Sequence, residues 1–107
     1  MQELTRKYVF HIPLFRYSDD GLVAIDIDDV LGDLIDLFNE SGFGSLYVTK
    51  VKSHYKSRCF DEVLLTLFCD GEGPEAIFED WFRKNNDTLK QEAFAFECGN
   101  RMYIEEL

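Results

Sequence analysis

The side chain best suited to acid–base chemistry is His11, which lies within a strand-like run, Lys7–Phe15 (KYVFHIPLF). Alternation along a strand places His11 on the face opposite to that of its apolar neighbours. On an open sheet face, an imidazole could act as a base or a ligand if a second polar group lay nearby. Glu92, Glu97 or Tyr103 could supply that group. The competing interpretation is a partly buried histidine held by structural hydrogen bonds.

Adjacent carboxylates are the other candidates for acid–base work. General acid–base catalysis needs groups whose environments separate their pKa values, usually through burial. Neighbouring acids that share one solvated environment do not meet this need. We therefore expect no catalysis from the adjacent pairs, which are Asp19 with Asp20, Asp28 with Asp29, Asp61 with Glu62, and Glu79 with Asp80.

Metal, thiol and phosphate chemistry have weaker support. Cys59, Cys69 and Cys98 form no Cys-x-x-Cys pair, and only two histidines exist to complete a metal site. We interpret the cysteines as free thiols that pack as small apolar groups. The glycines of Gly71–Pro74 open a helix, but the neighbouring glutamates make this segment too acidic for phosphate. We expect no metal and no cofactor, and the balance favours a protein that is not an enzyme.

Charge is sorted into two blocks, of which the first is acidic. Between Tyr17 and Thr49 there are eight carboxylates and no Lys or Arg. Carboxylates three or four residues apart lie on one face of a helix. We expect an acidic stripe that binds a basic partner, made of Asp26, Asp29, Asp33, Asp36 and Glu40.

The second block is basic. Between Ser41 and Phe60 there are no carboxylates and four cations, which are Lys50, Lys52, Lys56 and Arg58. Together with His54 they recur every second residue, and this spacing predicts one face of a strand. Such a surface could meet carboxylates of the same chain or of a second copy, or it could contact nucleic acid. It could also simply protect a sheet edge from aggregation.

Composition limits the class of protein. The chain has 107 residues, of which 46% are apolar and 30% charged, as expected for one globular domain spanning residues 1–107. Its net charge of −10 disfavours binding to nucleic acid or to an anionic membrane. No stretch has the ~18 apolar residues of a membrane span, and the N-terminal segment does not resemble a secretory signal. We expect a cytoplasmic protein.

Hydrophobic periodicity predicts the elements that position these groups. Runs of period two predict strands, and runs at i, i+3, i+4 and i+7 predict helices. The predicted order is a strand at Lys7–Phe15, a loop at Arg16–Leu22, a helix at Asp26–Ser41, strands at Gly44–Ser53 and Phe60–Asp70, a helix at Pro74–Asn85, a link at Thr88–Glu92, and short strands at Ala93–Cys98 and Arg101–Glu105. This order is typical of an α+β, ferredoxin-like βαββαβ sandwich, an antiparallel sheet with two helices on one face, here with a short extra C-terminal strand.

Individual residues indicate where some of these elements begin and end. Asp26 is expected to be the N-cap of the first helix, and Gly42 its C′ glycine. Pro13 cannot donate to a ladder, so the first strand should end there or pair on one side only. His54–Cys59 should form a hairpin loop or extend both flanking strands beyond the sheet.

Three short segments carry a resemblance: GFGSLYVTKV from Gly42, FDEVLLTLF from Phe60 and LKQEAFAFE from Leu89. With them, the last two thirds of the chain resemble small uncharacterised bacterial and phage proteins that share a Gly-Phe … Gln-Glu-Ala pattern. The resemblance implies a ferredoxin-like core and brings no activity with it.

Three functions are consistent with these observations. The main interpretation is a small acidic, non-enzymatic interaction or regulatory module that dimerises or docks on a basic protein. One alternative is a small dimeric α+β enzyme or ligand binder with a sheet-face cleft around His11. The other is nucleic-acid contact through the basic strand at residues 50–58. In the first two cases we expect a homodimer, because an open sheet face rich in aromatic residues needs a cover.

Overall fold

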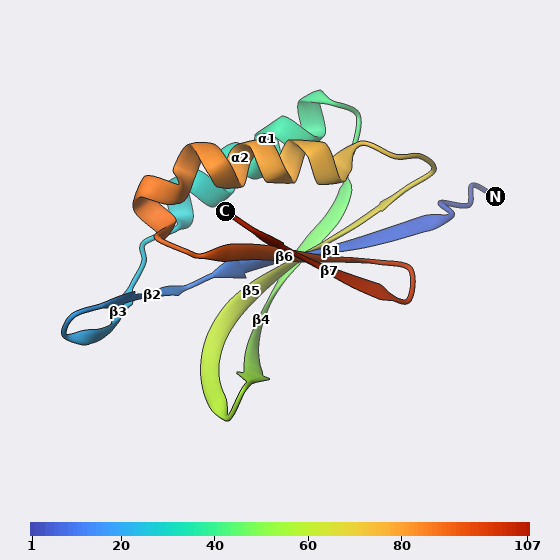
Figure 1. The fold of residues 1–107 in the computed structure, drawn as a ribbon. Helices are drawn as coiled ribbons and strands as arrows, with labels where there is room; N and C mark the ends of the chain where they lie inside the picture. Colours follow the sequence, from blue (N-terminus) through green and yellow to red (C-terminus); the bar gives the residue numbers. More distant parts are fainter.

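The chain folds into a five-stranded antiparallel sheet with two helices packed on one of its faces (Figure 1). The computed structural model describes residues 1–107. Its elements are β1 (Arg6–Pro13), β2 (Phe15–Ser18), β3 (Gly21–Ala24), α1 (Asp28–Glu40), β4 (Ser45–Tyr55), β5 (Arg58–Cys69), α2 (Pro74–Leu89), β6 (Ala93–Cys98) and β7 (Arg101–Glu106). The strand order in the sheet is β4-β5-β1-β6-β7, so the predicted α+β class with an antiparallel sheet is confirmed.

The first strand lies at the centre of the sheet because its alternation matches the pleat. Tyr8, Phe10 and Ile12 are buried on the helix-covered face, and His11 lies on the other, open face. On one side β1 pairs with β5 along its whole length, as far as Pro13 opposite Glu62. On the other side it pairs with β6 only over Tyr8–Phe10. The expected effect of Pro13 is confirmed, since the strand ends there and is paired on one side.

One cluster of 16 buried residues forms the core between the sheet and the helices. Phe10 is its centre, with ring centroids 4.6 Å from Phe78 of α2 and 5.3 Å from Phe38 of α1. Trp81 joins the helices, because its indole nitrogen donates to the Val30 carbonyl at 2.8 Å. Neither helix is long and apolar enough to cross a membrane.

The first helix starts two residues later than expected. Its N-cap is Ile27 rather than Asp26, and the Asp26 carboxylate instead accepts a hydrogen bond from the Asp28 amide at 3.2 Å. Asp26 therefore still satisfies a free amide of the first turn, from one position further out. Gly42 has the predicted role, with φ of +88° and the Phe43 amide bonded back to the Phe38 carbonyl at 2.8 Å.

The second helix runs one turn beyond the predicted end at Asn85. The side chains of Asn85 and Asn86 support the helix and do not end it. Asn85 donates to the Trp81 carbonyl, and Asn86 exchanges two hydrogen bonds with Gln91. The helix ends at Leu89, which is fully buried, and Lys90 follows with φ of +53°.

The segment predicted as a loop, Arg16–Leu22, is a small hairpin. Strands β2 and β3 pair from Phe15 opposite Ala24 to Ser18 opposite Gly21, forming a separate two-stranded sheet. The Ser18 hydroxyl accepts from the Asp20 amide at 3.2 Å and so closes the turn. Polar turn residues dominated the sequence signal and masked the two short strands on either side.

Strands β4 and β5 extend beyond the rest of the sheet as a long curved arm, visible in Figure 1. Because β1 ends opposite Glu62, the paired residues nearer the turn have no neighbour from β1. The turn is Lys56-Ser57, with φ of +49° and +64°. Of the two predictions for His54–Cys59, the extended strands are therefore correct.

Candidate functional site

The most unusual polar group lies on the open face of the sheet. Glu62 of β5 is only 8% exposed, although no helix covers this face. Its Oε1 lies 2.9 Å from Nδ1 of His11, and Nε2 of His11 lies 2.7 Å from Oε2 of Glu97. The Ser53 hydroxyl also donates to Glu62 Oε1. We call these four residues, Ser53, Glu62, His11 and Glu97, the open-face network.

Four strands supply one member each, and strand register brings them together. Glu62 lies opposite Pro13, two residues along β1 from His11. Glu97 lies opposite Val9, two residues from His11 in the other direction. The imidazole therefore reaches diagonally to a carboxylate on each side, a separation that long side chains span in antiparallel sheets.

The network places the His11 imidazole between two carboxylates, which favour its protonated form. Burial by itself would lower the pKa of His11, but the hydrogen bonds that it donates to Glu62 and Glu97 outweigh burial and raise that pKa above 6.5. Burial would raise the pKa of Glu62, but the bonds from His11 and Ser53 lower it below 4.5. Both ring nitrogens of His11 are occupied, and no cluster of His, Cys, Asp and Glu in the chain could hold a metal ion.

Apolar side chains surround the network on the same face. Glu97 lies between Val9 of β1 and Met102 of β7 in the register. Tyr47, Met102 and Ile104 are each more than half exposed on this face. The open face thus combines a partly buried carboxylate–imidazole group with exposed apolar surface, an arrangement that can bind a cation and transfer a proton.

The predicted partner Glu97 is confirmed as a contact of His11, whereas the other two candidates lie elsewhere. Tyr103 is on the helix-covered side, with its ring centroid 5.1 Å from that of Phe96. Glu92 is exposed, and its carbonyl accepts from the Leu107 amide. Whether His11 acts in catalysis stays a prediction.

Sequence reasoning missed Glu62, because it treated Asp61 and Glu62 as one solvated pair. Strand alternation places the two carboxylates on opposite faces, so Asp61 forms an ion pair with Lys52 at 2.9 Å while Glu62 is buried. The available signal was the apolar run that starts one residue later, since it marks an interior strand on which a carboxylate needs a partner.

The acidic stripe, Asp26, Asp29, Asp33, Asp36 and Glu40, lies along α1 and its N-terminal approach, and all five residues are exposed. None of them takes part in an ion pair. The structure places the stripe on the outer face of the helix as expected, and its binding to a basic partner stays a prediction.

The basic block does not form one strand face, which corrects the expectation. Register places Lys50, Lys52 and His54 on the same face of β4. Lys56 is in the turn, and Arg58 is on the returning strand, where its guanidinium donates to the Tyr17 hydroxyl at 2.8 Å. The basic residues recur every second position, but this spacing continues through a hairpin turn, so they do not all belong to one strand.

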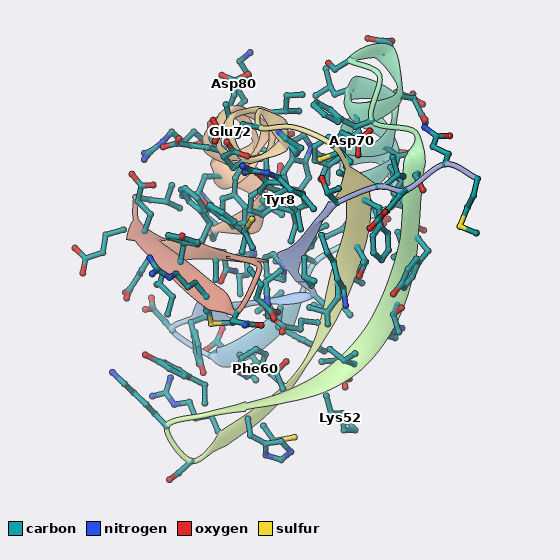
Figure 2. All side chains as sticks on the ribbon, turned by 90° about the vertical axis from the view of Figure 1, so that its right-hand side faces the viewer. Tyr8, Lys52, Phe60, Asp70, Glu72 and Asp80 are labelled. Carbon is teal, nitrogen blue, oxygen red and sulfur yellow. The ribbon has the colours of Figure 1, made fainter.

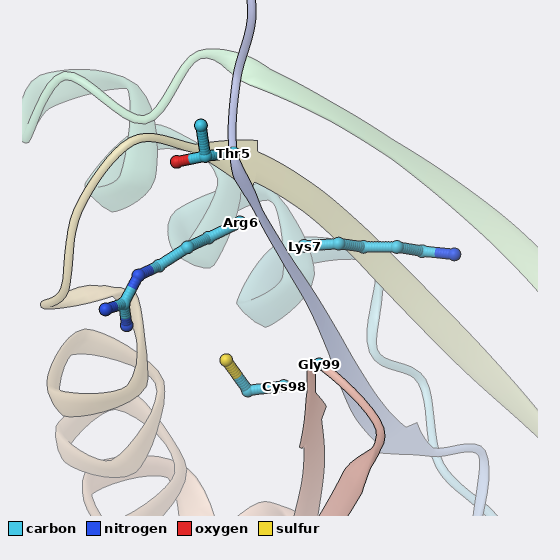
Figure 3. Close-up of a pocket in the computed structure, with 5 residues that line it drawn as sticks. All are labelled: Thr5, Arg6, Lys7, Cys98 and Gly99. Atoms are coloured by element: carbon cyan, nitrogen blue, oxygen red, sulfur yellow. The ribbon is translucent and has the colours of Figure 1, made fainter.

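The cysteines are three free thiols in different environments. Cys69 is buried and donates to the Gly71 carbonyl at 3.2 Å. Cys59 is exposed in the arm, with its sulfur 3.9 Å from Nε2 of His54. Cys98 is partly exposed beside Arg6, in a cavity of about 260 Å³ that Figure 3 shows.

A second cavity, of about 320 Å³, adjoins the one in Figure 3 and shares Arg6 and Cys98 with it. We call it the Tyr8 pocket; its other lining residues are Tyr8, Glu72, Glu75, Phe96 and Tyr103. Figure 2 shows Tyr8 and Glu72 at the same end of the molecule. The pocket lies on the helix-covered side of the sheet, whereas the open-face network lies on the other side.

Two solved structures match the whole chain, and both are of a phage SAM lyase. The structure in complex with S-methyl-5′-thioadenosine has a TM-score of 0.59 and 15% sequence identity, and the alignment covers 100% of this chain and 95% of that one. The apo structure has a TM-score of 0.60 with the same identity and coverage. No protein-family model and no curated protein matches the chain. At this identity the likeness shows a shared α+β fold.

The main interpretation from sequence, a non-enzymatic interaction module, is contradicted by this comparison, because both full-length structural neighbours are an enzyme. The acidic composition misled that interpretation, since charge describes the solvated surface and says little about a site on the sheet. The alternative interpretation, an α+β enzyme or ligand binder that uses the sheet face around His11, agrees better with the comparison.

Proposed function

We propose that this protein is a small enzyme that cleaves a sulfonium substrate related to S-adenosylmethionine at the open-face network. The observation that carries the proposal is Glu62, a carboxylate only 8% exposed on a face without a helix and hydrogen-bonded to His11. A partly buried group with a shifted pKa beside a charge partner is typical of catalytic sites. The fold shared with a SAM lyase supports the substrate class.

The charge of the network suits a cationic substrate. With His11 protonated, the two carboxylates leave the network a net charge of −1, and Glu97 presents 39% of its side chain to solvent. The substrate's ammonium group could therefore reach Glu97 without breaking the contact between His11 and Glu62. Such a charge-assisted hydrogen bond is stronger than a neutral one.

The apolar surroundings of the network suit the breaking of a carbon–sulfur bond. The positive charge on sulfur disappears as the bond breaks, so a carboxylate close to the sulfur would stabilise the substrate more than the transition state. Val9 and Met102 flank Glu97 in the register and offer an apolar contact for the sulfonium instead. Removing the sulfonium from water favours the loss of its charge.

A lyase completes this reaction without water. The electron pair of the broken bond goes to sulfur, which leaves as a neutral thioether. As the carbon–sulfur bond breaks, the carboxylate of the same chain attacks that carbon to form a lactone, or a base removes a proton from the neighbouring carbon and the electron pair of that C–H bond forms the double bond. In the second route the Glu97 oxygen that does not contact His11 would accept this proton, while His11 holds the Glu97 carboxylate in place. In the lactone route no protein base is needed, and the same oxygen would bind the ammonium group.

Product analysis tests this proposal. The purified protein is incubated with S-adenosylmethionine in ¹⁸O-labelled water, and methylthioadenosine and the carbon fragment are measured by mass spectrometry. We expect thioether release without incorporation of ¹⁸O from the solvent. Glu62→Gln and Glu97→Gln should each lower the rate by about a hundredfold.

The matched control is Asp61→Asn, which alters the adjacent carboxylate on the opposite face of the same strand. It should leave the rate unchanged. The proposal is wrong if no thioether forms, or if Glu62→Gln and Asp61→Asn lower the rate equally.

We also propose that a second copy of the chain covers the open face. The proposal is supported by the exposure of large apolar side chains at both edges of that face, Tyr47 (53%) on β4 and Met102 (52%) and Ile104 (60%) on β7, since exposed apolar surface can mark an interaction site. Light scattering should give at least a dimer, and Ile104→Glu should give a monomer. A wild-type protein that stays monomeric at the highest concentration tested would contradict this proposal.

Two finer assignments belong to the same proposal. The strand order β4-β5-β1-β6, with α1 after β1 and α2 after β5, supports the ferredoxin-like class, with β2–β3 inserted and β7 added at the edge. Three free cysteines suit a reducing compartment, which supports a cytoplasmic location.

A further inference from the structure

The Tyr8 pocket brings both signs of charge to one hydroxyl group. Arg6 enters from β1 and forms an ion pair with Glu72 at 3.5 Å, in which both side chains are well exposed. Glu75, in the first turn of α2, accepts long 3.3 Å contacts from the Gly73 amide. An exposed ion pair at this distance contributes little to stability, so a bound ligand can replace it.

Tyr8 lines this pocket together with Arg6, Glu72 and Glu75. Tyr8 belongs to the buried core, with 2% of its surface exposed, yet it lines the pocket. Burial raises the pKa of its phenol, and Glu75 acts in the same direction, whereas Arg6 opposes them. Because the Arg6 guanidinium and the Glu75 carboxylate line the same small pocket, one small molecule can contact both charges.

Two aromatic residues, Phe96 and Tyr103, also line the pocket. The rings of Phe96 and Tyr103 are stacked with centroids 5.1 Å apart, and Tyr103 is 45% exposed. Figure 3 shows the Arg6 and Cys98 side chains on one side of β1, while Lys7 points to the other side. The lining of the Tyr8 pocket therefore combines charged groups with an aromatic pair.

We propose that the Tyr8 pocket binds a free α-amino acid with an apolar side chain. The ligand carboxylate would replace Glu72 on the forked donors of Arg6. Its ammonium group would donate to Glu75 and to the Tyr8 oxygen. Its side chain would pack against the Phe96–Tyr103 pair. The cavity volume of about 320 Å³ lies at the small end of ligand sites, as a single amino acid requires.

This binding site is separate from the proposed active site. The two sites lie on opposite faces of the sheet and share no residue. Amino-acid binding to the Tyr8 pocket can therefore be measured, and can fail, independently of any cleavage of a sulfonium substrate.

Isothermal titration with a ligand series tests the proposal on the unmodified protein. The probes are L-leucine, L-methionine and L-phenylalanine, together with leucine methyl ester, which lacks the carboxylate, and 4-methylpentanoate, which lacks the ammonium group. We expect saturable binding of at least one amino acid below about 10 mM. Each truncated leucine analogue should bind at least about tenfold more weakly than leucine.

Three variants complete the test. Arg6→Met keeps the aliphatic stem and removes the charge, and Tyr8→Phe removes only the hydroxyl; each should weaken binding at least about tenfold. Lys50→Met, an exposed lysine without an ion pair, should have no effect, and neither should Glu62→Gln. Absence of saturable binding by all three amino acids would overturn the proposal. Equal binding of leucine and its methyl ester, or unchanged affinity in Arg6→Met, would also overturn it.

Discussion

Side chains on the two faces of the sheet are buried in different ways. On the helix-covered face, Phe10, Leu65 and Leu67 are fully buried by apolar side chains from α1 and α2. On the open face no helix is present, yet Glu62 and Thr66 of β5 are 8% and 5% exposed. These are the two polar residues that the structure buries, and both lie on the same face of one interior strand.

The difference shows two kinds of packing. The packing of the covered face is stabilised by many weak contacts between side chains that fill the available volume. The open face depends on a few named partners, because a buried carboxylate is stable only while its hydrogen bonds are satisfied. On the covered face, the loss of stability caused by a mutation should therefore depend on the side-chain volume that is removed. On the open face, it should depend on which hydrogen-bond partner is removed.

The largest expected effect is on the covered face. Phe10→Ala should lower the free energy of unfolding by about 3–5 kcal/mol, because it empties the centre of the aromatic cluster. Urea denaturation measures this change. Val9→Ala, the neighbouring residue on the open face, serves as the control and should cost less than half as much. Equal losses would mean that both faces are packed alike.

The next effect breaks the open-face network. His11→Leu leaves the Glu62 carboxylate partly buried without its main partner and should lower the free energy of unfolding by about 1–3 kcal/mol. The double variant His11→Leu with Glu62→Met removes both partners and should be more stable than His11→Leu alone. A double-mutant cycle in denaturant measures the coupling. If the losses in free energy of unfolding of the two single variants simply added in the double variant, His11 and Glu62 would not be coupled, and the prediction would be wrong.

The pH dependence of stability should show the same pair. The raised pKa of His11 contributes stability that is present below pH 6.5 and is lost as the pH rises through the raised value. The lowered pKa of Glu62 contributes stability that is present above pH 4.5 and is lost as the pH falls through the lowered value. The stability difference between wild type and His11→Gln should therefore be largest between pH 4.5 and 6.5. A difference that does not vary with pH would contradict this prediction.

The smallest expected effect is on the solvated surface outside both layers. Glu40 opposes the dipole at the end of α1 and lies four residues after Asp36. Glu40→Lys should raise the free energy of unfolding by about 0.5–1 kcal/mol at low salt, through a better helix end and a new pair with Asp36. The gain should shrink in concentrated salt. A gain that persists there would indicate a different cause.

The elements that the sequence predicted well are those with a strong local period. The i, i+3, i+4 pattern located α1 to within two residues, and Gly42 ended it where expected. Alternation in Lys7–Phe15 placed His11 on the open face and made Glu97 a candidate partner. These predictions succeeded because helix and strand periodicity depend on neighbouring residues alone.

The sequence predictions were wrong where turn signals compete with strand signals, or where a strand period runs across a turn. Polar residues in Arg16–Leu22 indicated a loop, but pairing between β2 and β3 outweighed them. Lys56-Ser57 contains no glycine, yet it forms the turn of the arm with both residues at positive φ. Long strand pairing on both sides of this turn stabilises a conformation that its residue types do not favour.

The sequence by itself determined the helices, the main strands and, within one strand or helix, which side chains share a face. Only the tertiary structure decided which of those side chains meet. Glu62 and His11 are 51 residues apart in the chain, and their 2.9 Å contact exists because β5 pairs with β1 in one particular register. A shift of that register by one residue would turn Glu62 to the helix-covered face. Periodicity is a local property, whereas register and burial depend on which distant segments pair, and the open-face network depends on both.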